Sequence, residues 1–161
     1  MTIETPTLRQ AAASDAAAVR ALTRAAYAKW VPLIGREPKP MSADYEAAVV
    51  RHRVDLAEIN GTLAALIETL PASDHLLIEN VAVVPVWQGR GLGRLLLRHA
   101  EELAVQQGFG EIRLYTNKRF EANVRLYLGV GYRIDREEES ALGVTVYMSK
   151  TVGASTTWAS C

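Results

Sequence analysis

The feature that most constrains the fold is a glycine-rich turn, Gln88-Gly89-Arg90-Gly91-Leu92-Gly93, which joins two differently patterned segments. The segment before it, Leu76–Val84, is rich in β-forming residues and is ended by Pro85. After the turn, apolar residues recur at helical spacing, at Leu92, Leu95, Leu96, Ala100 and Leu103. The sequence therefore predicts a strand, a tight turn and a helix in direct succession.

Such a turn predicts a cradle for a diphosphate. Glycines let the backbone approach a ligand closely, and the first turn of a helix offers free N–H groups to an anion. Arg90 and Arg94 can add positive charge. A Walker A loop would need Lys-Ser/Thr after its last glycine, and a dinucleotide fingerprint would need glycine where Arg94 stands. The alternative is a turn that uses glycine only for its geometry.

Hydrophobic patterning predicts further strands along the chain. The Asn60-Gly61 pair between two apolar runs predicts a hairpin with a type I′ turn, because both central residues of that turn need positive φ. The extended segments are expected at Thr7–Gln10, Val54–Ile59, Thr62–Thr69, Leu76–Val84, Glu111–Thr116, Tyr132–Glu137 and Val144–Lys150.

The remaining segments have helical patterns. One helix is expected to begin at Ser14-Asp15 and reach Trp30, and a second to be capped by Ser42 and cover about Ala43–His52. Two more are expected, from the glycine turn to Gly108 and over Glu121–Leu128. This order of elements predicts an α/β (α+β) fold, with a mixed central sheet of about seven strands and helices on both faces.

Composition narrows the class of protein. The 161 residues are 49% hydrophobic and 22% charged, which is typical of one globular domain. There are 18 basic residues (Lys plus Arg) and 18 acidic residues (Asp plus Glu), so the net charge of zero gives no reason to expect nucleic acid as a partner. No apolar run is long enough for a membrane span. The N-terminal residues lack a secretory signal pattern and the single cysteine is Cys161, so we expect a cytoplasmic protein with no metal site.

Several motifs taken together carry a family resemblance. They are the segment Glu79–Pro85, the Gln-x-x-Gly-x-Gly pattern of the turn at Gln88–Gly93, Asn123-x-x-x-Tyr127, and Gly129-x-Gly131-Tyr132. With the order of elements, they resemble the GNAT N-acetyltransferase superfamily over about residues 5–150, which leaves 151–161 as a C-terminal tail. The resemblance implies the fold of that superfamily and acetyl-CoA as co-substrate.

The resemblance also implies which residues contact the coenzyme. The strand backbone would contact pantetheine and the acetyl group, the N–H groups of the turn would hold the diphosphate with Arg94 close by, and the next helix would add a contact from Asn123. The residues concerned are Val81, Ala82 and Val83 in the strand, Gln88, Gly89, Arg90, Gly91, Leu92, Gly93 and Arg94 in the turn, and Asn123 and Tyr127 in the helix.

Two residues are the expected catalytic groups. By resemblance Tyr127 is the general acid for the coenzyme thiolate, although a core tyrosine is the alternative. Glu79 is expected to be the general base, because it lies two residues before Val81 and therefore points to the same face of the strand. A solvent-facing or ion-paired Glu79 is the alternative, and His75 acting through water is another candidate base. We expect direct attack, with the Val81 N–H stabilising the tetrahedral intermediate.

The acceptor is expected near the first helices. Tyr27, Trp30 and Tyr45 are candidate walls of its pocket, and Tyr27 and Trp30 sealing the core is the alternative. The leading function is transfer of an acetyl group to a primary amine of a small molecule. A protein acetyltransferase acting on an N-terminus or a lysine, and a silent acyl-CoA-binding module, are the competing hypotheses. The last strands and Trp158 permit a homodimer.

Overall fold

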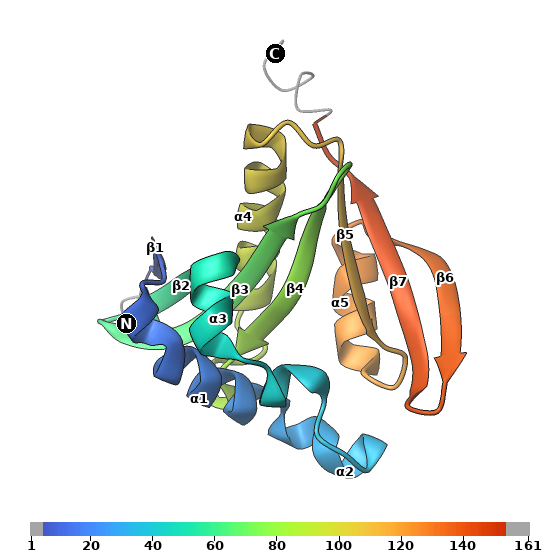
Figure 1. Ribbon diagram of the computed structural model, residues 1–161, viewed down its shortest axis with the longest axis horizontal. Helices are drawn as coiled ribbons and strands as arrows, with labels where there is room; N and C mark the ends of the chain where they lie inside the picture. Colours follow the sequence, from blue (N-terminus) through green and yellow to red (C-terminus); the bar gives the residue numbers. More distant parts are fainter. Residues whose placement is uncertain (1–4, 154–161) are drawn as a thin grey trace. The chain divides into compact units, whose positions relative to one another are not determined.

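The computed structural model describes residues 5–153, with each helix and strand labelled in Figure 1. The chain forms two compact units, and each is described by itself. The first unit comprises the chain up to Thr69 together with Asn80–Leu96. The second unit comprises Leu70–Glu79 together with the chain from Leu97 on. Strand β4 (Leu76–Val83) and helix α4 (Leu92–Gln106) therefore contribute to both units.

The first unit is a small antiparallel sheet with helices. Strand β1 (Thr7–Gln10) pairs with β2 (Arg53–Ile59), and β2 pairs with β3 (Thr62–Pro71). The helices are α1 (Ala16–Tyr27), α2 (Val31–Ile34) and α3 (Tyr45–Arg51). Between β2 and β3, Asn60 has φ of 53° and Gly61 has φ of 76°. The predicted type I′ hairpin is confirmed, because only that turn type places both central residues in the left-handed region.

The expected serine caps are wrong at both helix starts. Ser14 lies inside a short 3₁₀ turn, Ala13–Asp15, and Asp15 accepts a hydrogen bond from the Ala12 N–H at 2.7 Å. Helix α3 is capped by Asp44, whose Oδ1 accepts from the Ala47 N–H at 3.1 Å, while Ser42 ends the preceding 3₁₀ turn. A carboxylate at a helix start gains from the macrodipole as well as from the hydrogen bond, so Asp44 competes well with the hydroxyl of Ser42 two residues earlier.

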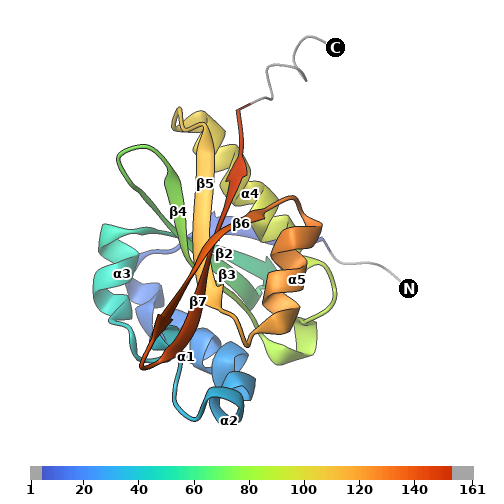
Figure 2. The ribbon, with the colours of Figure 1, turned by 90° about the vertical axis from the view of Figure 1, so that its right-hand side faces the viewer.

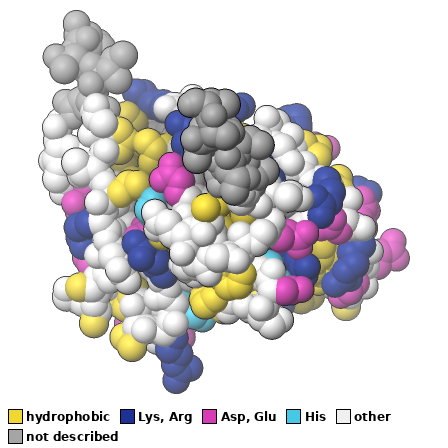
Figure 3. Space-filling model, turned by 90° about the horizontal axis from the view of Figure 1, so that it is seen from above, with side chains coloured by type: hydrophobic (Ala, Val, Ile, Leu, Met, Phe, Trp, Pro, Cys, Tyr) yellow, Lys and Arg dark blue, Asp and Glu magenta, His cyan; other side chains and the backbone are white. Residues whose placement is uncertain are grey.

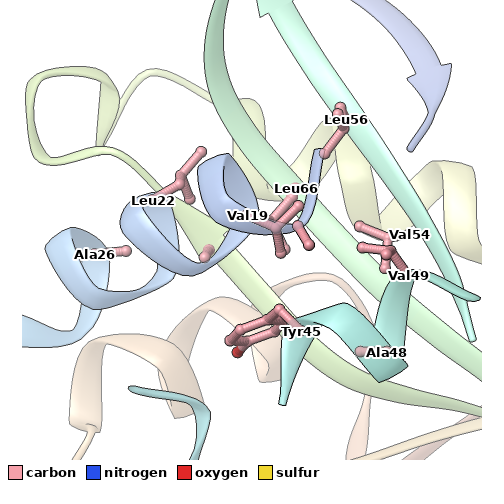
Figure 4. Packing of buried hydrophobic residues seen from close by; sticks show 11 residues of the cluster. Val19, Leu22, Ala26, Tyr45, Ala48, Val49, Val54, Leu56 and Leu66 are labelled. Atoms are coloured by element: carbon pink, nitrogen blue, oxygen red, sulfur yellow. The ribbon is translucent and has the colours of Figure 1, made fainter. Parts of the chain in front are cut away.

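Buried apolar side chains of two helices and three strands form the core of the first unit. Figure 4 shows α1 and α3 pointing theirs toward one another and toward β2 and β3. Val19, Leu56 and Leu66 are fully buried. The labelled members are Val19, Leu22 and Ala26 from α1, Tyr45, Ala48 and Val49 from α3, and Val54, Leu56 and Leu66 from the strands.

The second unit is built on three strands and the beginning of β4. Strand β5 (Glu111–Asn117) pairs antiparallel with β7 (Gly143–Thr151), which pairs antiparallel with β6 (Arg133–Ser140), and Figure 2 shows these three next to one another. The start of β4 pairs with β5 in parallel, Leu76 with Ile112 and Leu77 with Arg113. Helix α5 (Glu121–Gly129) is followed by Val130, whose carbonyl accepts a 2.7 Å hydrogen bond from Lys150 Nζ.

The strand order confirms the predicted fold class. All seven strands belong to one mixed sheet with the order β1-β2-β3-β4-β5-β7-β6. Strand β6 runs past its predicted end at Glu137, because residues 138–140, all exposed and polar, continue it. Thr151, expected to open the tail, is the last residue of β7, and residues 154–161 of the tail, with Trp158 and Cys161, lie outside the described residues.

Surface charges are paired locally. The Arg9 guanidinium hydrogen-bonds Asp15 and lowers the pKa of that carboxyl to about 2. Arg24 pairs with Glu37 at 2.7 Å. On the face in Figure 3, basic side chains lie beside acidic ones. Such exposed pairs are each worth about 0–1 kcal/mol, so they say little about stability. Over residues 5–153, no helix is long and apolar enough to cross a membrane.

Two valines on helices of the first unit test the assigned core. Val19→Ala in α1 empties a fully buried position, whereas Val50→Ala in α3 changes a side chain that is 70% exposed. We expect Val19→Ala to lower the free energy of unfolding by about 2 kcal/mol, from ~0.8 kcal/mol per buried CH₂ plus a cavity penalty. The matched Val50→Ala variant stays within about 0.5 kcal/mol of wild type. Urea titration measures both, and equal losses would contradict the assigned core.

Candidate active site

Strand β4 leads into the turn with a strict alternation of exposure. Its buried residues are Leu76, Ile78, Asn80 and Ala82, and its half-buried residues are Leu77, Glu79, Val81 and Val83. Glu79 and the two valines therefore point to the same face of the strand, as predicted from their spacing. The strand ends at Val83, and the Val84 N–H donates to Ala64 O on β3 at 2.9 Å.

The glycine turn has the geometry that its sequence predicts. Gly89 has φ of 77° and Gly91 has φ of 90°, and helix α4 begins at Leu92 directly afterwards. An added Cβ at either glycine would meet no atom within 4 Å, so the glycines are required by backbone conformation and not by crowding. The first N–H groups of α4, those of Leu92, Gly93 and Arg94, have no acceptor inside the helix by the rule of helix ends. The turn thus supplies donors for an anion.

Gln88 holds the turn against the strand. Its Nε2 donates to Val83 O at 2.9 Å, and its Oε1 accepts from Lys29 Nζ at 2.8 Å. Its backbone N–H donates to Pro85 O, so this N–H is engaged within the turn. Arg90 lies over the Trp87 ring at 5.1 Å. Burial lowers the pKa of Lys29, since its ammonium loses water on this side.

The aromatic residues expected at the acceptor pocket enter a polar network on Asn80. The Tyr27 hydroxyl donates to Asn80 Oδ1 at 2.8 Å and lies 3.3 Å from Val81 O. Tyr45 is buried in the core, and its hydroxyl donates to Pro40 O at 2.6 Å. Asn80 Nδ2 donates to Tyr45 Oη at 3.4 Å and to Thr23 at 3.3 Å. These contacts favour the core role for Tyr27 and Tyr45, while Trp30 is half-buried beside the Lys29 ammonium.

In the second unit, Glu79 is paired with a residue that the sequence patterns did not single out. Tyr115 on β5 donates its hydroxyl to Glu79 Oε1 at 2.9 Å. The parallel register explains the contact, because Leu76 faces Ile112 and three residues further along each strand come Glu79 and Tyr115. This register between strands distant in sequence is the signal that would have found Tyr115.

Tyr127 is buried near a second tyrosine. It lies on α5, only 8% exposed, and its ring packs 6.0 Å from that of Tyr132. Burial raises the pKa of Tyr127 to about 12, because the phenolate would lose its hydration. Asn123, half-buried four residues earlier on α5, lies on the same helical face. His75 is engaged at the other end of β4, with its Nδ1 2.7 Å from Asp74 Oδ1.

The chain is similar in sequence to known acetyltransferases. Residues 18–132 match the model of the Acetyltransferase (GNAT) family. The chain is 31% identical over 84 residues to N-acetyltransferase family 8 member 3 of Rattus norvegicus, covering 48% of this chain and 37% of that protein. It is 33% identical over 73 residues to the [Ribosomal protein bS18]-alanine N-acetyltransferase of Escherichia coli (strain K12), covering 45% and 49%. These matches span less than half the length of either relative.

The solved structures agree with the family model on the fold. The PaiA N-acetyltransferase of Thermoplasma acidophilum, determined in complex with coenzyme A, superposes with a TM-score of 0.77 at 18% identity. The match covers 91% of this chain and 99% of that one. At this identity the likeness shows the fold alone, whereas the family model covers most of the sequence. The chain belongs to the GNAT acetyltransferase family, as its motifs predict.

Proposed function

We propose that the chain is an N-acetyltransferase that moves the acetyl group of acetyl-CoA to a primary amine of a small molecule by direct attack. The observation that carries the proposal is the turn between β4 and α4, with two left-handed glycines and open space around both. Three N–H groups at the start of a 15-residue helix suit the diphosphate of a coenzyme. The complex of the PaiA relative with coenzyme A supports this ligand.

The remaining roles follow from the chemistry of the transfer. The amine nitrogen forms a bond to the acetyl carbon, the C–S bond breaks, the thiolate of the coenzyme leaves, and the amine loses a proton. In the proposal the Val81 N–H faces the developing oxyanion, and Glu79 accepts the proton. The Tyr115 hydroxyl fixes the Glu79 carboxylate through Oε1. Asn123 stays a proposed coenzyme contact.

The high pKa of Tyr127 sharpens its proposed role. A thiol has an ordinary pKa near 8.5, so full proton transfer from a phenol with a pKa of about 12 to the thiolate is uphill by about 5 kcal/mol. A hydrogen bond donated to the thiolate costs no such transfer and stabilises the same charge. We therefore assign Tyr127 as a hydrogen-bond donor to the leaving thiolate, with the proton arriving later from solvent.

The acceptor could also be an amine of a protein. The likeness to a [Ribosomal protein bS18]-alanine N-acetyltransferase favours this second candidate. An α-amine with a pKa near 7.8 needs only about 1 kcal/mol to become neutral at pH 7, against about 4.6 kcal/mol for a lysine-like amine, so a weak base suffices for it. An assay of coenzyme A release against small amines and peptides separates the two candidates. Tight binding of acetyl-CoA with no release on any amine would overturn both and leave a binding module.

Removing the Tyr127 hydroxyl tests its role. Tyr127→Phe lowers kcat by about tenfold to a hundredfold, because a hydrogen bond to a charged group is worth about 1.5–3 kcal/mol, and leaves the affinity for acetyl-CoA unchanged. Tyr132→Phe is the matched control, since the buried Tyr132 hydroxyl has no hydrogen-bond partner within residues 5–153. Steady-state kinetics and calorimetric binding measure both variants. A Tyr127→Phe enzyme with wild-type kcat would remove Tyr127 from the mechanism.

The pH profile makes an independent prediction. A raised pKa keeps the phenol of Tyr127 protonated until pH approaches about 12, so its donor remains available through alkaline pH. We expect kcat to show no fall between about pH 7 and pH 10 that depends on Tyr127. A descending limb below pH 10 that disappears in Tyr127→Phe would show that the group titrates normally and would contradict the assignment.

The glycine turn is tested by its backbone requirement. Gly91→Ala forces an L-residue to φ of 90°, which costs about 1–3 kcal/mol or reshapes the turn. We expect acetyl-CoA to bind about tenfold more weakly or worse, with little change in the KM for the amine. Gly110→Ala is the control, because Gly110 has an ordinary φ and equally open surroundings. Equal coenzyme affinity in the two variants would count against a diphosphate site at this turn.

A further inference from the structure

Four side chains form a row across four adjacent strands of the second unit. Glu79 on β4 accepts a hydrogen bond from Tyr115 on β5, and Tyr115 lies directly opposite Tyr147 on β7, with ring centroids 6.0 Å apart. Tyr147 in turn lies opposite Arg136 on β6, whose guanidinium carbon is 3.8 Å from the ring centroid. The row therefore runs from a carboxylate over two aromatic rings to a guanidinium.

A β-bulge completes this row. The register between β6 and β7 pairs Ile134 with Met148 and then Arg136 with Tyr147, so Asp135 is the extra residue. Without the bulge, Asp135 would stand opposite Tyr147 and place a carboxylate at that end. Arg136 is held in position by Glu138, whose Oε2 accepts from it at 2.7 Å. The bulge thus gives the row opposite charges at its two ends.

The row lies on the face of the strands opposite the packed core. Leu114, Val146 and Met148 alternate with these residues along β5 and β7 and are almost completely buried. Tyr115 is 42% exposed, Tyr147 and Glu79 are half-buried, and Arg136 is exposed. A ligand in solution can therefore reach the two rings and the carboxylate from this face.

We propose that this row is the acceptor site and that it selects a primary amine with an aromatic body and a single positive charge. The inference rests on the proposed acetyltransferase function. The ammonium group pairs with Glu79, and an aromatic body stacks on Tyr115 and Tyr147. Neighbouring strands are about 4.8 Å apart, so the backbones at Glu79 and Tyr147 are separated by about 10 Å, and an arylalkylamine whose ammonium meets Glu79 places its ring between Tyr115 and Tyr147. The guanidinium of Arg136, which lies over the Tyr147 ring, repels the second ammonium of a diamine.

An acceptor panel tests the proposal on the full chain. Coenzyme A release is measured with 2-phenylethylamine, propylamine and 1,5-pentanediamine, compared at equal concentrations of neutral amine. We expect kcat/KM for 2-phenylethylamine to exceed that for the other two by about tenfold, the size of one or two aromatic contacts. If no amine is turned over, the proposed function fails; if all three are used equally well, only this inference fails.

Variants of the row identify the residues responsible. Tyr147→Leu lowers kcat/KM for 2-phenylethylamine about threefold to tenfold and leaves propylamine unchanged, and Tyr147→Phe, which keeps the ring, restores the preference. Arg136→Gln raises the use of 1,5-pentanediamine relative to propylamine. Leu142→Ala, at an exposed position in the same hairpin, is the control for effects on the fold. A Tyr147→Leu enzyme that loses the same factor with every amine, or nothing with any, would overturn the proposal.

Discussion

The chemistry proposed for this chain depends on the conformation of two glycines. Gly89 and Gly91 hold positive φ values that carry the chain from β4 into α4 within a few residues. An L-residue at either place would pay a conformational penalty although space is available, so the constraint lies in the backbone. Eight residues, among them the 3₁₀ turn Pro85–Trp87, separate the end of β4 from the start of α4, so the first N–H groups of a long helix lie close in sequence to the strand whose backbone is proposed to contact the acetyl group. The Gln88 side chain, bonded to Val83 O, holds the two together.

A second constraint is the pairing of β4 with β5. The parallel ladder pairs Leu76 with Ile112 and Leu77 with Arg113. Two residues beyond Leu77 and Arg113, on the same face, the Tyr115 hydroxyl donates a hydrogen bond to the Glu79 carboxylate. From that point the row continues over Tyr147 to Arg136. The same register thus fixes the proposed base and the proposed acceptor face. In this proposal the general base Glu79, the two tyrosine rings that bind the aromatic body, and the Arg136 cation that repels a second ammonium lie in one row.

The local parts of the structure could be predicted from the sequence, and the long-range parts could not. The Asn60-Gly61 turn, the glycine turn and the shared face of Glu79 and Val81 depend on neighbouring residues, so their patterns were sufficient. The predicted caps were wrong because residue type alone does not choose between neighbouring polar residues: Asp44 caps α3 in place of Ser42, and Ser14 lies inside the 3₁₀ turn that precedes α1. Tyr115 was missed because its contact with Glu79 needs the register of strands over thirty residues apart. Tyr45 is a candidate pocket wall by sequence but lies in the core, because helical spacing does not show whether an aromatic side chain faces the core or a pocket.

The N–H groups of the turn are proposed to hold the diphosphate of the coenzyme. The most direct measurement is a titration of the isotopically labelled chain with coenzyme A, followed through its backbone amide resonances. We expect the largest shifts at Gly89, Gly91, Leu92, Gly93 and Arg94, since these N–H groups would exchange water for phosphate oxygen. Saturable binding that leaves all five amides unchanged would contradict this proposal.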